Sequence, residues 1–308
     1  MVRYLFFAVL LICALLPAAA GASTCMMCHG SMEGRLEGAK GVVDVGIDAE
    51  RFADSVHGSL ECTNCHVTYG IVPHSPPGGE VPGALAELVP AIARKSRIDP
   101  VAQAACSMCH PQVFDEYRRS VHGRNIFDKG KDDAPLCVGC HGSPHYIAPA
   151  SSPESEVSHG RLLHTCGNCH ENERIAEEYG FSSHVIEKYE ESFHGKKYIL
   201  GHTKVPICND CHGSHYIVAA DAADSPVQGD AKVQTCGKCH KNATRKFAAA
   251  PAHKYIGKDN PIPYYGEKAL IVLVLGVFGF TVSHVVLEAF AEVREKVMKK
   301  EDKGEGHE

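Results

Sequence analysis

The chain has 308 residues, of which 15 are Cys and 20 are His, whereas only 11 are Phe, 11 are Tyr and none is Trp. A hydrophobic share of 44% and a charged share of 22% are ordinary for a folded protein and exclude wholesale disorder. The net charge of -6 gives no sign of a nucleic-acid-binding surface. A chain this rich in Cys and His and this poor in aromatic residues is not expected to be organised by an ordinary apolar core.

The N-terminus has the pattern of a secretory signal peptide, which we predict over residues 1–22. Arg3 precedes an apolar run over residues 4–16, and small residues follow over 18–22. Cleavage is expected after Ala22, with Ala20 as the alternative, and an uncleaved anchor is the other interpretation. The signal predicts that the rest of the chain is exported, a setting in which paired cysteines often form disulfides.

The most specific feature is a five-residue motif, C-x-x-C-H, that occurs seven times. We number the copies in chain order as motifs 1 to 7, at residues 25–29, 62–66, 106–110, 137–141, 166–170, 208–212 and 236–240. This motif is the attachment signature of c-type haem: two thiols form thioethers with one porphyrin, and the following His becomes the proximal iron ligand. The sequence therefore predicts seven covalently bound haem c groups.

These motifs use every cysteine except Cys13, which lies in the signal peptide. The cysteines predicted to bind haem are Cys25, Cys28, Cys62, Cys65, Cys106, Cys109, Cys137, Cys140, Cys166, Cys169, Cys208, Cys211, Cys236 and Cys239. The predicted proximal ligands are His29, His66, His110, His141, His170, His212 and His240.

Three other interpretations of paired cysteines fit this pattern less well. Disulfides are common in exported proteins but leave the His after every pair unexplained. Zinc ribbons use two C-x-x-C pairs for each metal ion, and seven pairs is an odd number. Thioredoxin-like pairs occur singly on a βαβ unit, which the sequence does not show.

An internal repeat indicates where the second axial ligands come from. An S-x-H-G segment precedes motifs 2, 4 and 6, at residues 55–58, 120–123 and 192–195, and another His follows each of these motifs. The chain thus divides into repeat 1 (about 25–105), repeat 2 (106–165), repeat 3 (166–235) and a partial repeat 4 (236–260). Methionine, the other common axial ligand, is nearly excluded, because only Met32 lies outside the signal, the motifs and the C-terminal region.

Seven histidines are predicted as distal iron ligands. They are His57, His122 and His194 in the S-x-H-G segments, His74, His145 and His215 after motifs 2, 4 and 6, and His253, which matches the S-x-H-G position of repeat 4. His74 and His253 have the alternative of being ordinary surface histidines, and His159, His164 and His184 would then replace them. Which haem each distal His serves is not readable from the order of the chain.

A second apolar segment predicts a transmembrane helix over residues 267–292. Residues 269–290 form an apolar run long enough to cross a bilayer, and Pro261 and Pro263 are expected to end any regular structure before it. Arg294 and four lysines follow, which places the tail, 293–308, in the cytoplasm and residues 23–260 in the periplasm. A buried core helix is the alternative.

Three polar residues, Thr281, His284 and Glu288, share one face of this predicted helix. Ionisable groups inside a bilayer usually face a protein partner, so this face is expected to pack on an integral membrane subunit. The alternative is that His284 and Glu288 lie at the cytoplasmic interface, partly exposed to water.

The predicted fold class is mainly α with irregular loops, organised around stacked haems, with one C-terminal transmembrane helix. Short helices should carry the motifs, residues 84–89 and 172–189 should be helical, and almost no β-sheet is expected. Because attachment of the cofactor and folding should be coupled, the chain without haem should not fold.

The S-x-H-G and C-x-x-C-H-G-x-H patterns resemble those of multihaem cytochromes c in bacterial respiratory chains, in particular the heptahaem subunit of cytochrome bc-type quinone oxidoreductases. The motifs that carry the resemblance cover residues 25–253. The C-terminal anchor departs from the tetrahaem quinol dehydrogenases, whose anchor is N-terminal, so no quinol-site residue is carried over.

The resemblance and the ligand count imply an electron-transfer protein rather than a catalyst. Iron with histidine on both faces has no open site, so we expect electrons to pass between a quinol-oxidising integral membrane subunit, for example a b-type cytochrome, and periplasmic cytochromes. No catalytic residue is predicted. The alternative is a periplasmic multihaem reductase of the nitrite, sulfite or hydroxylamine type, in which one haem keeps an open distal position.

Overall fold

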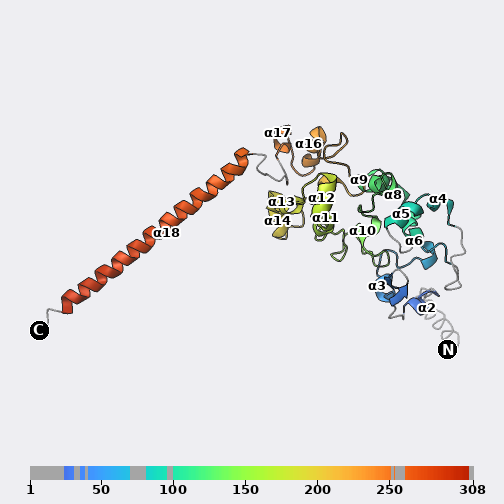
Figure 1. Cartoon of the computed structure of the whole chain (residues 1–308), viewed down its shortest axis with the longest axis horizontal. Helices are drawn as coiled ribbons and strands as arrows, with labels where there is room; N and C mark the ends of the chain where they lie inside the picture. Colours follow the sequence, from blue (N-terminus) through green and yellow to red (C-terminus); the bar gives the residue numbers. More distant parts are fainter. Residues whose placement is uncertain are drawn as a thin grey trace, which may run out of the picture. The chain divides into compact units, whose positions relative to one another are not determined.

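The computed structural model describes residues 24–30, 35–38, 41–69, 81–95, 100–250, 253 and 261–304. It divides into two compact parts, Met1–His253 and Lys254–Glu308. The first part carries all seven motifs, and the second is one long helix (Figure 1). The predicted signal peptide and His74 lie outside the described residues.

The N-terminal part is mainly helical, as predicted, and its helices are short. They are α2 (Met26–His29), α3 (Ala49–Ala53), η1 (Cys62–Asn64), α4 (Gly83–Ala86), α5 (Val89–Lys95), α6 (Pro100–Ala104), α7 (Cys106–Cys109), α8 (Pro111–Arg119), α9 (Val121–Phe127), α10 (Cys137–His141), α11 (Leu162–His170), α12 (Glu173–Tyr179), α13 (Val185–Glu191), α14 (Phe193–Ile199), α15 (Cys208–His212), α16 (Gly229–Gly237) and α17 (Arg245–Ala248). The β-structure of the described residues is one antiparallel hairpin of β1 (Arg35–Gly38) and β2 (Gly41–Asp44).

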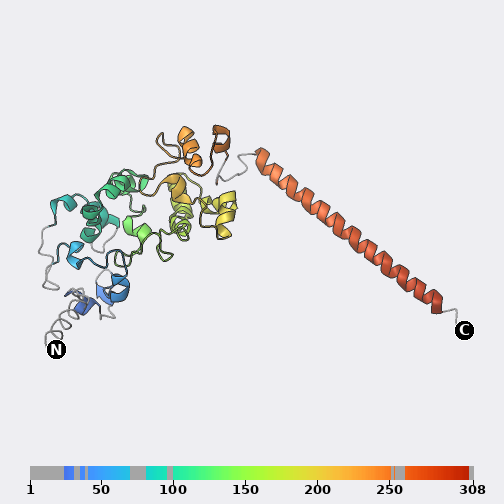
Figure 2. The ribbon, with the colours of Figure 1, turned by 180° about the vertical axis from the view of Figure 1, so that it is seen from behind.

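Within this part, the segments follow one another in space in the order of the sequence. In both Figure 1 and Figure 2, α2 and α3 lie at one end, α10 lies in the middle, and α16 and α17 lie at the other end.

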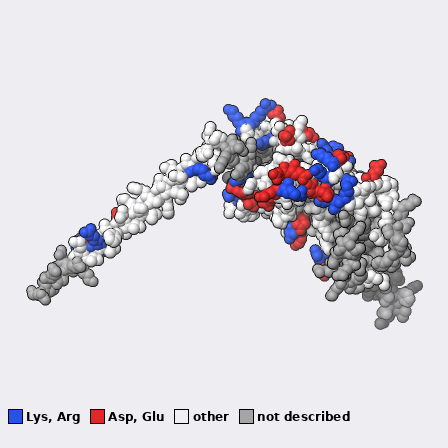
Figure 3. Space-filling view, viewed as in Figure 1, with Lys and Arg blue, Asp and Glu red and all other residues white. Residues whose placement is uncertain are grey.

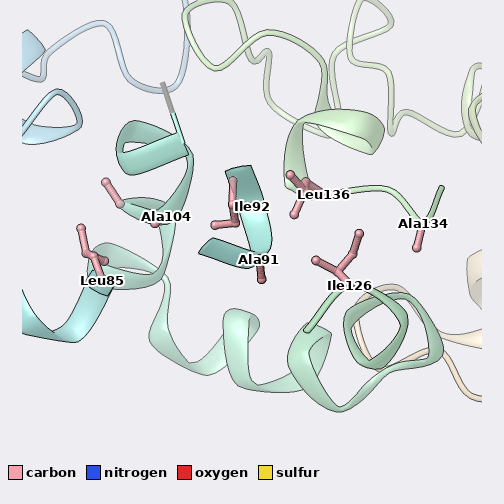
Figure 4. Close-up of a cluster of buried hydrophobic side chains, with 8 residues drawn as sticks. Leu85, Ala91, Ile92, Ala104, Ile126, Ala134 and Leu136 are labelled. Atoms are coloured by element: carbon pink, nitrogen blue, oxygen red, sulfur yellow. The ribbon is translucent and has the colours of Figure 1, made fainter. Parts of the chain in front are cut away.

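The larger apolar core lies beside motifs 3 and 4. Figure 4 shows Leu85, Ile92, Ile126 and Leu136 with several alanines, contributed by α4, α5, α6, α9 and the segment before α10. A smaller cluster joins Leu162, Leu163, Tyr189 and Ile207 beside motifs 5 and 6. Of the fifteen buried hydrophobic residues in the described part of the chain, six are alanine, so these clusters are small for a chain of this length.

Two of the predicted helices are interrupted. The predicted helix over 172–189 is two helices, α12 and α13, because Gly180 ends α12 in the left-handed conformation with φ of 71°. Its N–H and that of Phe181 both bond to the carbonyl of Ala176. The helix expected over 84–89 is likewise divided between the end of α4 and the start of α5.

The C-terminal helix is longer than predicted. α18 runs from Pro261 to Gly304, and the stretch Tyr264–Lys299 is long and apolar enough to cross a bilayer, which confirms the apolar helix. The prediction that Pro261 and Pro263 end regular structure was wrong, because proline fits the first turn of a helix, where its missing N–H has no partner to lose. In Figure 3, most of the length of α18 is white, the colour of residues other than Lys, Arg, Asp and Glu, and Lys and Arg (blue) lie near both of its ends.

Candidate functional site: the cysteine–histidine motifs

Each C-x-x-C-H motif occupies about one helical turn. Motifs 4 and 6 coincide with α10 and α15, motif 5 ends α11, and in the others the His N–H bonds to the carbonyl of the first Cys, for example His110 to Cys106 at 3.0 Å. Residues three and four positions apart lie on the same face of a helical turn. Both sulfurs and the imidazole of a motif are thus presented to one side, as attachment of a single porphyrin requires.

The S-x-H-G segments of repeats 2 and 3 form sharp corners between two helices. Ser120 is fully buried, and its Oγ accepts a hydrogen bond of 3.1 Å from the Gly123 N–H, which caps α9 after α8. Ser192 caps α14 after α13 in the same way, with its Oγ 3.1 Å from the Gly195 nitrogen. In each corner the serine accepts a hydrogen bond from a backbone N–H that has no partner within the first turn of the helix. The cap thereby fixes the position of the S-x-H-G histidine, which lies in that turn.

The glycine of each S-x-H-G segment lies against a backbone carbonyl. A Cβ atom at Gly123 would stand 2.1 Å from the carbonyl oxygen of Tyr117, and one at Gly195 would stand 2.0 Å from that of Tyr189. At Gly58 the corresponding distance, to the oxygen of Ala53, is 2.3 Å. The repeated glycine is therefore required for close approach of the two helices at the corner.

Replacing this glycine should destabilise the protein. We expect Gly123→Ala to lower the free energy of unfolding by about 1–3 kcal/mol or more, since backbone atoms must shift to admit the methyl group. Gly83→Ala is the matched control, because a Cβ there meets nothing within 4 Å. Thermal unfolding followed by circular dichroism checks the pair, and equal melting temperatures for the two variants would refute the role of the corner.

A tyrosine that sequence reasoning missed joins each corner to the next motif. The Tyr117 hydroxyl donates a hydrogen bond of 2.8 Å to the carbonyl of Pro135, two residues before Cys137, and Tyr189 makes the same bond to Pro206, before Cys208. Burial, followed by the nearby sulfurs of Cys137 and Cys208, raises the pKa of the two hydroxyls. The available signal was the Tyr three residues before the Ser in repeats 2 and 3.

The structure brings six predicted proximal histidines beside six predicted distal ones. The pairs are His66 with His145, His110 with His57, His141 with His215, His170 with His122, His212 with His253 and His240 with His194. Each pair takes one histidine from a motif and one from outside the motifs. We call the surroundings of motifs 1 to 7 sites 1 to 7.

The six pairs share one separation but not one orientation. Their ring centroids lie 5.9–6.4 Å apart, whereas the angle between the ring planes ranges from 12° to 77°. A metal–imidazole bond of about 2.0 Å and a ring radius of about 1.1 Å place two imidazoles on opposite sides of one metal ion about 6.2 Å apart, centroid to centroid. A shared axial metal fixes this distance and leaves rotation about the axis free, so the residues fit haem iron.

The predicted ligands come from different repeats in a regular exchange. The S-x-H-G histidine of each complete repeat pairs with the first motif of the next repeat, as His122 does with His170. The histidine after the second motif pairs with the second motif of the repeat before, as His215 does with His141. Backbone bonds join the two kinds of distal segment to each other: the Val121 N–H, next to His122, donates to the Ile217 carbonyl at 2.8 Å, and the Val56 N–H, next to His57, donates to the Ile147 carbonyl at 2.9 Å.

This exchange also reassigns His253. Its position in the sequence suggested the S-x-H-G role, but its ring lies 5.9 Å from that of His212. It therefore takes the place of the histidine that follows a second motif, in the last and partial repeat. The two positions are hard to tell apart in repeat 4, since that repeat lacks a second motif to mark them.

Burial favours the neutral form, which binds metals, in six of the paired histidines. Burial, and then the neighbouring His170, lowers the pKa of His122 to about 4. Burial followed by the paired histidine also lowers the pKa of His141, His145, His194 and His212, and burial lowers that of His170. Neutral imidazole has the nitrogen lone pair that a metal ion needs.

Hydrogen bonds fix the tautomer at two predicted ligands. Nδ1 of His57 donates to the carbonyl of Pro144 at 3.1 Å, and Nδ1 of His29 donates to the carbonyl of Val45 at 2.7 Å, which leaves Nε2 with its lone pair. In His159, one of the alternative ligands, Nε2 itself donates to the Val205 carbonyl at 2.8 Å. In His184, an exposed side chain, Nδ1 instead pairs with Glu187 at 2.9 Å.

The predicted distal ligand His74 lies outside the described residues, so its role as a ligand stays a prediction. Among the residues that the structure describes, no group of three or more His, Cys, Asp or Glu could hold a metal ion alone. Haem iron needs only two protein ligands, because the porphyrin supplies four. In α18, His284 lies 3.8 Å from Glu288, nitrogen to oxygen.

Comparison with known proteins gave no relative. No family model, no curated protein sequence and no solved structure matches the chain.

Proposed function

We propose that the chain is an electron-transfer multihaem cytochrome c, with seven haem c groups attached at motifs 1 to 7. The observation that carries the proposal is the set of six histidine pairs. In each pair, the two ring centroids are separated by about the distance expected for two imidazoles on opposite sides of one metal ion. Bound at these sites, haem would supply iron that takes up and releases single electrons. The protein residues attach it, occupy both axial positions and hold neighbouring groups close together.

Occupied axial positions favour electron transfer over catalysis. In a reductase, one iron must keep a face open for substrate, whereas in six of the seven sites a histidine stands opposite the motif histidine. Two imidazole ligands also favour a lower reduction potential than the His and Met pair of other cytochromes. The described residues thus support a relay at low potential.

The two ends of the chain support a membrane location. A signal peptide would export the motifs to the periplasm, and α18 would cross the inner membrane, with Arg294, Lys296 and Lys299 on the cytoplasmic side. We propose a quinol-oxidising integral membrane subunit as the electron donor. Oxidation of one quinol to quinone releases two protons and two electrons, and the electrons would pass singly through this chain to periplasmic redox proteins.

Disulfides are the main rival for the cysteines, and two sulfur contacts would suit them. Cys106 and Cys137 line one hollow, and Cys166 and Cys208 pack against the same apolar cluster. These contacts involve only the first cysteine of four motifs and give no reason for the histidine pairs. Adjacent thioethers at the edges of neighbouring porphyrins explain both the sulfur contacts and the histidines.

Ligand binding separates the relay from the reductase. When carbon monoxide is added to the reduced protein, we expect no rapid change in the haem absorption bands, because every iron has a histidine on both faces. His145→Ala should create one site that binds carbon monoxide, and the exposed His202→Ala should not. Rapid binding of one equivalent by the unaltered protein would favour the reductase and would point to site 1, which lies outside the six histidine pairs.

A further inference from the structure

Neighbouring motifs touch inside repeats 2 and 3. Cys106 of motif 3 lies near Cys137 of motif 4, and Cys166 of motif 5 packs with Cys208 of motif 6 against one apolar cluster. A hollow between motifs 3 and 4 is lined by both cysteines of the first pair together with Phe114. Because a thioether sulfur lies at the porphyrin edge, these contacts bring sites 3 and 4, and sites 5 and 6, edge to edge.

A second kind of contact joins the repeats. The Val121 N–H, next to His122 of site 5, donates a hydrogen bond of 2.8 Å to the Ile217 carbonyl, two residues after His215 of site 4, so site 4 lies beside site 5. Helix α15, which is motif 6, contacts α16, which carries Cys236 of motif 7, so site 6 lies beside site 7. The two kinds of junction alternate along the chain from site 3 to site 7.

Backbone and side-chain contacts extend the series to the first motif. Pro144, whose carbonyl accepts the bond from His57 of site 3, immediately precedes His145 of site 2. The segment after motif 1 contacts His29 through Val45, and the N–H of Asp48 donates to the Tyr146 hydroxyl at 2.9 Å, next to His145. Sites 1, 2 and 3 are therefore consecutive neighbours as well.

We propose that the seven sites form a single file in chain order, from site 1 at one end to site 7 at the other. The inference rests on the proposed function and adds the order of the sites and the absence of branches. Each transfer oxidises one iron from Fe(II) to Fe(III), reduces the next from Fe(III) to Fe(II), and moves no proton. In a single file, an electron supplied at site 7 must pass every site between it and its destination.

Photoreduction from one end tests the order. Lys246 is exposed on α17 beside Phe247, whose ring lies 4.8 Å from that of His240 of site 7. A ruthenium photoreductant attached to Lys246→Cys, with an amine as sacrificial donor, would deliver electrons at site 7. Haem absorption after each flash counts the haems that are reduced in the fast phase, and intact mass counts the haems that are present.

Removing one site at a time should stop electron transfer from site 7 at the missing site. Each double variant carries six haems, and the fast phase should include one of them in C208A/C211A, which lacks site 6, and three in C137A/C140A, which lacks site 4. The control C25A/C28A, which lacks terminal site 1, should keep all six in the fast phase. Electron tunnelling falls steeply with distance, so the remaining haems should follow in a slow phase.

The outcomes separate the two proposals. Equal fast amplitudes in the three variants, with six haems confirmed in each, would overturn the single file and leave the proposed function standing. Fewer than seven haems in the parent protein would instead overturn the proposed function. If one variant does not accumulate, the other two still give different predicted amplitudes.

Discussion

Without covalent haem attachment, the chain should fail to fold. The described residues bury nine hydrophobic side chains larger than alanine, and eight of them form the two clusters beside the motifs. Such a small apolar core does not offset the conformational entropy of ordering the chain, which costs about 1–2 kcal/mol for each residue backbone. Haem bound as we propose would supply the rest of the interior, so we expect binding and folding to be one process.

The experiment compares the chain produced in cells with and without the machinery that attaches haem. We expect the haem-free polypeptide to be degraded or, if recovered, to show little helical circular dichroism and no cooperative thermal transition. Because α18 belongs to the other part of the chain, the loss of structure should be measured in the residues that carry the motifs. Protease resistance of residues 100–250, compared with and without haem attachment, is therefore the sharper measurement. A haem-free chain that keeps native helicity and unfolds cooperatively would contradict the account.

Replacing His122 should open the haem of motif 5, although motifs 3 and 4 are the nearer ones in the sequence. The His122 ring lies 6.3 Å from that of His170, and the capped corner of α9 holds it there. We expect His122→Ala to convert one haem in seven to a high-spin form that binds carbon monoxide after reduction. Electron paramagnetic resonance and the absorption spectrum report the change.

Double variants identify which haem has changed. In a C166A/C169A background, which lacks the haem of motif 5, His122→Ala should open no further site. In a C137A/C140A background, it should open one, as it does in the parent chain. The exchange between repeats would be wrong if the two backgrounds gave the reverse result, and His202→Ala, at an exposed histidine outside every pair, should be silent in both.

The ligand types could be predicted from the sequence, because they depend on short patterns. The five-residue motifs specify a local turn, and the S-x-H-G segment specifies a cap and a close approach at Gly123 and Gly195. Six of the seven predicted distal histidines lie beside a motif histidine. The seventh, His74, lies outside the described residues.

The pairing of those ligands could not be predicted in the same way. His57 and His110 belong to different repeats, and their approach depends on long-range contacts such as that between Val56 and Ile147. Sequence periodicity carries no information about such contacts. The break at Gly180 and the helical start at Pro261 depended instead on local backbone preferences that the hydrophobic pattern conceals.

The mass of the intact mature polypeptide tests the central claim most directly. Attachment at all seven motifs predicts the chain mass plus seven haem groups, retained after denaturation and reduction because thioethers survive both. Disulfides would instead lower the chain mass by two hydrogen atoms for each bond, a reducing agent would restore it, and no haem would be added. That result would contradict the account, as would any number of haem groups below seven.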